Sequence, residues 1–277
     1  MQSKINRAVG LFVALVFLGS EAHAQASALS DAATQPAKGR FAWREQARFE
    51  RYELLGNDMD QWTIDTRLIY GLRKDVSLTL NVPTILRDRD MISVTGLGDQ
   101  EGLGDTTLML KWRFWQHDPA PVDTNRLALI GGLRLPTGTD GLSTEGWDPF
   151  VGLTFTKVED RHGMNASVRY TVSTDGLAEP ISAGTGDADL LTLETSWLYR
   201  LSPSEYTSET DASLYFTVES FVDYETNGDV SWRVAPGLLY EARRWTAELS
   251  PILPIAQDID HRAELEWGLA FGLRFLF

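Results

Sequence analysis

Hydrophobic and polar residues alternate with a period of two along most of this chain. The clearest run is the last one, where leucine and aromatic residues from Leu265 to Phe277 share one face, and Glu264, Glu266 and Arg274 lie on the other. Similar runs begin near Trp62, Val76, Thr106 and Met164. This period is typical of β-strands, because successive side chains of a strand point to opposite faces.

About a dozen such segments of roughly ten residues follow one another, which is the length that a tilted strand needs to cross the hydrocarbon of a membrane. Pro236 and Pro251 interrupt two of them, and we expect a bulge or a broken ladder there because proline donates no hydrogen bond. The expected strands cover residues 42–52, 61–72, 75–83, 104–115, 126–136, 149–158, 164–173, 188–200, 211–222, 230–241, 245–253 and 263–277.

Two opposite folds share this pattern, because a soluble barrel turns its apolar face inward and a membrane barrel turns it outward. Connections of alternating length favour the membrane barrel, since outer-membrane barrels combine short periplasmic turns with longer outer loops. The final residue, Phe277, ends an amphipathic strand, as in the C-terminal signature of outer-membrane barrels. The pattern therefore predicts an all-β protein, a single closed antiparallel transmembrane β-barrel of about twelve strands, closed because lipid tolerates no open sheet edge.

Outward aromatic residues gather at the ends of the expected strands. Aromatic rings prefer the level of the lipid headgroups, so two girdles are expected in a membrane barrel. The girdle residues are Trp62, Tyr70, Trp112, Trp197, Tyr199, Trp232, Tyr240, Trp245, Phe275 and Phe277.

The opposite faces of the strands carry charges of both signs, which would line the interior. Mixed charges can pair with one another, and the set then forms either a salt-bridged plug or a polar constriction that selects solutes. The predicted lumen-lining residues are Arg67, Lys111, Arg113, Arg134, Arg169, Arg233, Arg274, Asp65, Glu194, Glu219, Glu248 and Glu266.

The first 24 residues have the features of a signal peptide. Lys4 and Arg7 precede a short apolar stretch, and Ala22-His23-Ala24 is a small-x-small cleavage pattern. We expect cleavage after Ala24, a flexible tail over residues 25–40 and a barrel over residues 41–277, with too few residues before the first strand for a separate plug domain.

Composition narrows the functions further. The formal charge of −14 argues against a nucleic-acid partner, which requires a basic surface. The absence of cysteine excludes disulfides, cysteine-bound metals and thiol catalysis. His117, His162 and His261 share no strand face at ligand spacing, so we expect no metal site and no cofactor.

Glycine-rich and proline-containing motifs carry a family resemblance. The motifs are Gly102-Leu-Gly-Asp-Thr-Thr-Leu-Met-Leu-Lys-Trp-Arg-Phe114, Leu133-Arg-Leu-Pro-Thr-Gly138 and Asp148-Pro-Phe-Val-Gly152. With them the chain resembles the family labelled "transporter" or meta-pathway of phenol degradation. The resemblance implies an outer-membrane barrel with a role in uptake, and it assigns no functional residues.

We therefore expect an exported, non-enzymatic channel or porin in the outer membrane of a Gram-negative cell, admitting small, aromatic or hydrophobic molecules by passive diffusion. Its partners would be the membrane lipid, the solute and the barrel-assembly machinery that recognises Phe277. Two alternatives stay open. One is a structural or adhesive barrel with a lumen closed by salt bridges, and the other is a lipid-modifying barrel enzyme that would use His261 with Ser93 or Ser143.

Overall fold

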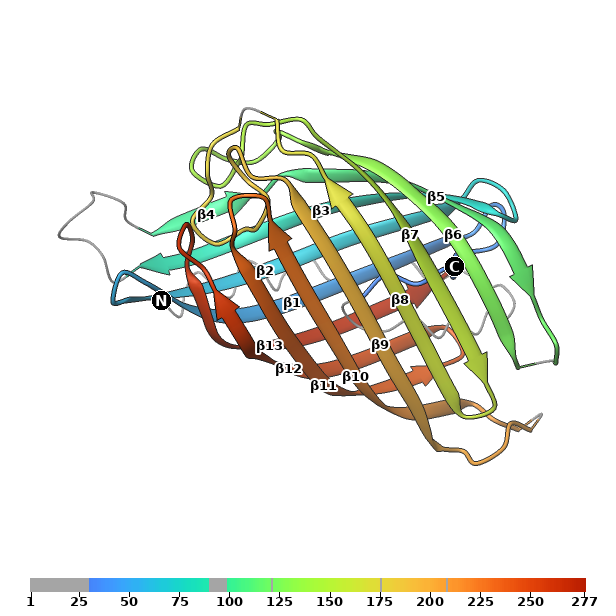
Figure 1. The fold of residues 1–277 in the computed structure, drawn as a ribbon. Coiled ribbons are helices and arrows are strands. Elements are labelled where there is room, and N and C mark those ends of the chain that lie inside the picture. The colour runs from blue at the N-terminus through green and yellow to red at the C-terminus, as the bar shows by residue number, and fades with distance from the viewer. Residues whose placement is uncertain (1–29, 90–98, 121, 175, 208) are drawn as a thin grey trace.

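A computed structural model describes residues 30–89, 99–120, 122–174, 176–207 and 209–277 (Figure 1). The expected signal peptide, residues 25–29 of the expected tail, Ser93 and the start of the glycine-rich stretch at residues 96–98 lie outside the described residues.

The described chain is built from strands and their connections. None of it forms a helix that is long and apolar enough to cross a membrane. The strands are β1 (Phe41–Leu54), β2 (Asn57–Gly71), β3 (Val76–Arg89), β4 (Gln100–Leu103), β5 (Thr106–His117), β6 (Thr124–Leu135), β7 (Asp148–Glu159), β8 (His162–Thr171), β9 (Leu190–Ser202), β10 (Ala212–Glu225), β11 (Val230–Ala242), β12 (Trp245–Asp258) and β13 (Glu264–Leu276).

These strands form one closed antiparallel sheet. β1 pairs with both β2 and β13, and the pairing of β2 with β3 completes the ring. β4 and β5 both pair with β3, and between them the Gly104 N–H donates to the Pro83 carbonyl at 2.9 Å. They therefore share one position in the wall, which leaves twelve positions for thirteen strands and confirms the predicted barrel.

The apolar faces of the strands point away from the barrel. Leu108, Trp267 and Phe271 are 40%, 42% and 46% exposed, whereas Arg274 and Glu219 are buried on the opposite face. In a membrane the exposed apolar face meets the acyl chains. The reverse arrangement of a soluble barrel, with large apolar residues packed at the centre, does not occur at these positions.

The ladder between β11 and β12 is interrupted where the two prolines lie. Val234 pairs with Leu253 and Leu238 pairs with Leu249, but the residues between these positions do not pair across β11 and β12. Pro236 and Pro251 fall in this gap, and neither carries an N–H to donate. The broken ladder predicted from the sequence is confirmed.

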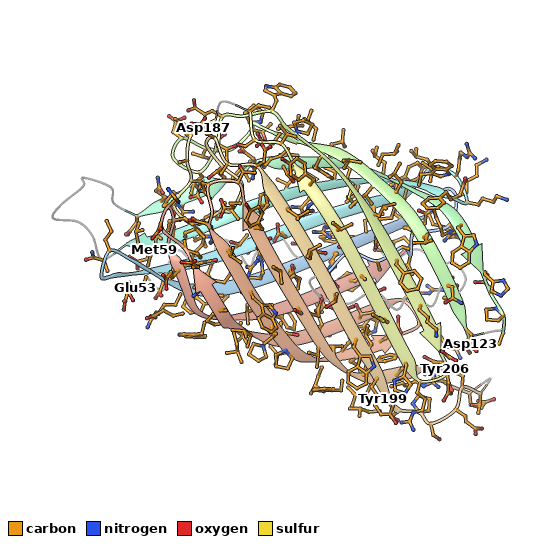
Figure 2. The ribbon with its side chains drawn as sticks, viewed as in Figure 1. Glu53, Met59, Asp123, Asp187, Tyr199 and Tyr206 are labelled. Atoms are coloured by element: carbon orange, nitrogen blue, oxygen red, sulfur yellow. The ribbon has the colours of Figure 1, made fainter. Side chains whose placement is uncertain are left out.

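The two ends of the barrel differ in the chain segments that lie there. At the end that we call the terminal end, the Phe41 and Phe277 backbones exchange two hydrogen bonds, of 3.2 and 2.9 Å. At the opposite end, the loop end, the long connections 136–147 and 172–189 leave the strands. Figure 2 shows Glu53, Met59 and Asp187 at the loop end, and Asp123, Tyr199 and Tyr206 at the terminal end.

Candidate functional site in the barrel interior

Strand alternation brings most of the predicted lumen residues to one surface, the inside of the wall. Their side chains are buried or half-buried, and they alternate with the exposed apolar residues of the same strands. The inward residues are Arg67, Lys111, Arg113, Arg134, Arg169, Arg233, Arg274, Asp65, Glu194, Glu219 and Glu248.

Glu266 is the exception, because β13 contains a bulge. Arg51 pairs with Trp267 and Tyr52 pairs with Leu265, so Glu266 is the extra residue between two pairs. The bulge shifts the alternation by one residue, so that Leu265 points inward and Glu266 is exposed. The structure thus corrects the sequence-based placement of Leu265 and Glu266.

The interior charges are largely paired with one another, between adjacent strands or across one intervening strand. Taking a charge out of water is costly, and a close partner offsets that cost. The pairs are Arg44–Glu248 at 2.9 Å, Arg48–Asp65 at 3.1 Å, Arg134–Asp148 at 2.6 Å, Arg274–Glu241 at 3.6 Å, and Arg233 with Asp223.

Several partners in these pairs were not among the predicted site residues. Arg44 and Arg48 alternate with Trp43, Ala47 and Phe49 in β1, so the period-two pattern could have identified them. The other missed residues are Glu50, Arg87, Asp148, Asp223, Glu225 and Glu241, all buried in the interior.

Residues 30–37, which we call the inner segment, run from the exposed Ala37 into the barrel. They enter from the terminal end, where the Gln35 side chain donates to the Lys74 carbonyl at 3.3 Å, and reach Glu219 at Ser30. Three backbone N–H groups of the segment donate to the wall, from Ser30 to Glu219 Oε2 at 2.8 Å, from Asp31 to Glu194 Oε2 at 2.9 Å and from Ala33 to Thr156 Oγ1 at 2.8 Å. In the other direction, Lys111 Nζ donates to the Ala32 carbonyl at 2.5 Å.

This placement differs from the expected flexible tail. The small residues that suggested flexibility also allow the segment to fit a narrow interior, and Ala32 and Ala33 are 4% and 0% exposed. Gly71 in the wall makes room for the segment, because a Cβ there would lie 2.1 Å from the Ala37 carbonyl oxygen. No separate plug domain is needed to fill the terminal half of the lumen.

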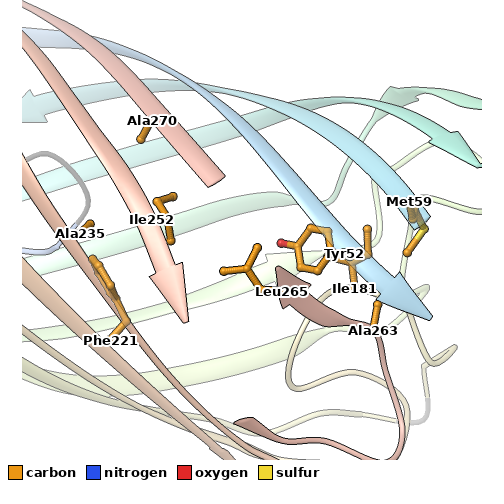
Figure 3. Packing of buried hydrophobic residues seen from close by; sticks show 9 residues of the cluster. All are labelled: Tyr52, Met59, Ile181, Phe221, Ala235, Ile252, Ala263, Leu265 and Ala270. Atoms are coloured by element: carbon orange, nitrogen blue, oxygen red, sulfur yellow. The ribbon is translucent and has the colours of Figure 1, made fainter. Parts of the chain in front are cut away.

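The connection 172–189 folds over the loop end of the lumen. Its Glu179 is buried and pairs with Arg87 of β3 at 2.5 Å, and Glu179 also accepts the N–H groups of Ile181 and Ser182. Ile181 packs into an apolar cluster on the inside of the wall (Figure 3). The other members are Tyr52, Met59, Phe221, Ala235, Ile252, Ala263, Leu265 and Ala270.

Between the inner segment and this connection lies a cavity of about 410 Å³, which we call the chamber. Asp31 bounds it toward the terminal end, and Ser182 and Ala183 bound it toward the loop end. Its wall combines charged groups with the apolar side chains of Met109, Phe150, Phe221 and Ile252. The volume falls in the range of sites for small organic ligands, about 300–1,000 Å³.

The aromatic residues predicted for the girdles lie on the outer surface of the barrel. Trp62, Trp112 and Trp232 are among those that are exposed, and neighbouring rings contact one another. Tyr240 lies 5.2 Å from Trp245, and Trp197 lies 6.0 Å from Tyr199. Trp43, Phe49 and Trp267, which were not predicted as girdle residues, also take part in these ring contacts. The girdle role of the predicted set, Trp62, Tyr70, Trp112, Trp197, Tyr199, Trp232, Tyr240, Trp245, Phe275 and Phe277, remains a prediction.

The histidines do not assemble a metal centre, since no group of three possible metal ligands occurs among the described residues. His261, in the loop 259–263, has its Nδ1 at 2.9 Å from Asp229 Oδ1. The hydrogen bond to Asp229 raises the pKa of His261. Burial opposes ionisation of Asp229, but the N–H groups of Asp260 and His261 and the His261 ring lower the pKa of its carboxyl.

The sequence of residues 38–242 matches the sequence model of a family described as "Putative MetA-pathway of phenol degradation". The chain belongs to this family. The match covers well over half of the chain and confirms the resemblance drawn from the glycine-rich motifs. No curated protein sequence matches the chain.

The fold of the chain has a counterpart among solved structures. The chain is similar to the COG4313 outer membrane channel from Pseudomonas putida F1, with a TM-score of 0.62 and 13% identity over 89% of this chain and 98% of that one. It also resembles the β domain of the Bordetella autotransporter BrkA, with a TM-score of 0.47 and 13% identity over 87% and 100% of the two chains. The similarity to the COG4313 channel shows that the fold of this family member is that of an outer-membrane barrel, which supports an outer-membrane location.

Proposed function

We propose that this protein is an outer-membrane channel that takes up small, aromatic or apolar molecules by passive diffusion. The single observation that carries the proposal is the chamber, a cavity of about 410 Å³ inside the barrel that is lined by both apolar and charged side chains. The COG4313 protein is described as an outer membrane channel, and the description of the family names phenol degradation. The first description agrees with a channel, and the second agrees with a one-ring solute.

Passage requires that two closures move. At the loop end the Arg134 guanidinium donates to the Gly184 carbonyl at 2.6 Å, and at the terminal end four hydrogen bonds hold Ser30, Asp31, Ala32 and Ala33. A hydrogen bond of this kind contributes about 1 kcal/mol net to stability. Neither closure belongs to the ladder of the barrel, so each can open while the wall stays intact.

Export and membrane insertion belong to the same proposal. We propose cleavage after Ala24, which would leave few residues before the inner segment, and recognition of Phe277 by the assembly machinery. Phe277 also helps to join β1 to β13, since its N–H donates to the Phe41 carbonyl at 2.9 Å. Removal of Phe277 should therefore reduce the amount of folded barrel in the outer membrane, whereas Phe277→Tyr, which keeps the aromatic ring, should not.

A closed structural barrel is the second candidate. The ion pairs and the inner segment favour it, because together they occupy much of the lumen. The lipid-modifying alternative has less support. His261 is hydrogen-bonded to Asp229, and Ser143 donates to Asp105 at 2.7 Å.

Uptake into liposomes distinguishes the channel from the closed barrel. Purified full-length protein is reconstituted into liposomes, and entry of phenol is followed with a dye or an enzyme trapped inside. We expect entry faster than through protein-free liposomes of the same lipid, and faster again when residues 30–37 are removed. Equal rates in all three preparations would refute the channel.

A further inference from the structure

Among the described residues, two of the arginines that line the chamber form no close ion pair with a carboxylate of the wall. Arg48, Arg134 and Arg233 each pair with a carboxylate of a strand. Among the described residues, Arg67 forms one ion pair, with Asp31 of the inner segment. Its Nη1 lies 3.8 Å from Asp31 Oδ1. Arg169 has no ion pair among the described residues. The wall carboxylates Asp65 and Glu194 attract these two arginines only from beyond ion-pair distance, so a close anion for them comes from elsewhere.

Asp31 supplies that anion. Its carboxylate is attracted by Lys111, Arg67 and Arg169 together, and it lies at the boundary of the chamber. The inner segment carries it there on a backbone held by Glu194 and Glu219. Asp31 thus occupies the position that a free carboxylate entering the chamber would take, since both would be drawn to the same guanidinium groups.

The surroundings of these cations suit an aromatic ring. The Arg169 guanidinium lies 5.6 Å from the centre of the Phe150 ring, and Phe150 packs with Met109. Gly132 leaves space for this ring, because a Cβ there would lie 2.4 Å from Phe150 Cζ. Phe150 and Met109 both line the chamber. A planar ring can therefore rest on the apolar wall while its carboxylate reaches Arg67 and Arg169.

We propose that the chamber binds small aromatic carboxylates at Arg67 and Arg169, and that Asp31 is a tethered competitor for this site. Binding of the free carboxylate displaces Asp31, and with it the inner segment. The proposal names the substrate class of the proposed channel and in that respect rests on the proposed function. When Asp31 occupies the site in most molecules, the apparent affinity for the free carboxylate falls in proportion to the fraction of molecules in which the site is open.

Titration calorimetry with benzoate tests the competition, using the full chain in detergent micelles and benzamide as the neutral control of the same shape. Asp31→Asn should bind benzoate about tenfold more tightly than the unaltered protein, since the competitor has lost its charge. Arg169→Gln should lose most benzoate binding, and Arg67→Gln provides a second variant should the first fail to fold. Equal benzoate affinities of Asp31→Asn and the unaltered chain, or equal binding of benzamide and benzoate, would overturn the proposal.

Displacement of the inner segment has its own readout, because the chain contains no cysteine. Thr34→Cys places a single thiol in the segment, and Ser204→Cys places one in an exposed turn as a control. Benzoate should speed the modification of Cys at position 34 by a small thiol reagent and leave position 204 unchanged. An unchanged rate at position 34 under saturating benzoate would show that the segment stays in place and would refute the displacement.

Failure of this inference is separate from failure of the channel. Phenol carries no carboxylate, so its entry into liposomes tests the channel without engaging Arg67 or Arg169. If phenol enters the liposomes but Asp31 and benzoate do not compete, only the carboxylate site is refuted. If they compete but phenol does not enter, only the channel is refuted.

Discussion

Asp148→Asn should loosen the closure at the loop end. One oxygen of Asp148 accepts Arg134 Nε at 2.7 Å and Nη2 at 2.6 Å, and the other accepts the Thr174 N–H at 2.9 Å. Asp148 is 1% exposed and the Arg134 side chain 19%. Removing one partner of a buried ion pair lowers the free energy of unfolding by about 3–5 kcal/mol. Because Arg134 is partly exposed, we expect a loss near the lower end of this range, about 3 kcal/mol, for Asp148→Asn.

The cost can be measured by urea unfolding of the protein in lipid vesicles, followed by the fluorescence of its nine tryptophans. In the double variant Arg134→Gln/Asp148→Asn, the loss of unfolding free energy should be about 2 kcal/mol smaller than the sum of the losses in the two single variants, because no unpaired charge remains. The half-exposed pair Arg51–Asp60 provides the control, and Arg51→Gln should lower the free energy of unfolding far less than Asp148→Asn does. Additive effects of Arg134→Gln and Asp148→Asn would refute the coupling.

Three further outcomes follow from the same structure. Leu110→Arg, on the lipid-facing side of β5, should lower the free energy of unfolding in vesicles by about 2–4 kcal/mol, whereas Leu110→Met should change it little. Because its pKa is raised, His261 should hold the loop 259–263 to Asp229 below the ordinary histidine pKa of about 6.5 and release it as the pH rises through the raised value. Hydrogen exchange at the Asp260 amide should follow that release, and His261→Gln should abolish the pH dependence. Entry of benzoate should become faster as salt rises, because salt screens the repulsion from exposed carboxylates at the loop end, and a rate independent of salt would contradict this. Those carboxylates are Glu53, Asp58, Asp140, Asp187, Asp258, Asp260 and Glu264.

The barrel could be predicted from the sequence because strand alternation is a local property. A period of two fixes which side chains share a face, and the membrane then decides which face points outward. The broken ladder at Pro236 and Pro251 was predictable for the same reason, since a proline lacks the N–H wherever its partner lies. The bulge at Glu266 was not, because it depends on the register between β13 and β1.

The filling of the lumen could not be read from the chain in this way. The hydrogen bond between Ser30 and Glu219 spans 189 residues, and no local pattern joins them. The composition of residues 25–40 predicts flexibility, but buried carboxylates of the wall need donors, and the backbone of the inner segment provides them. The pairing of Arg87 with Glu179 likewise depends on how the connection 172–189 folds over the barrel.

Ion conductance across a planar lipid bilayer tests the channel most directly. The full chain and a variant that lacks residues 30–37 are compared in the same lipid and salt. An open path through the chamber predicts a small conductance for the full chain and a severalfold larger one for the variant. Two preparations that both leave the bilayer non-conducting would contradict the channel and favour the closed structural barrel.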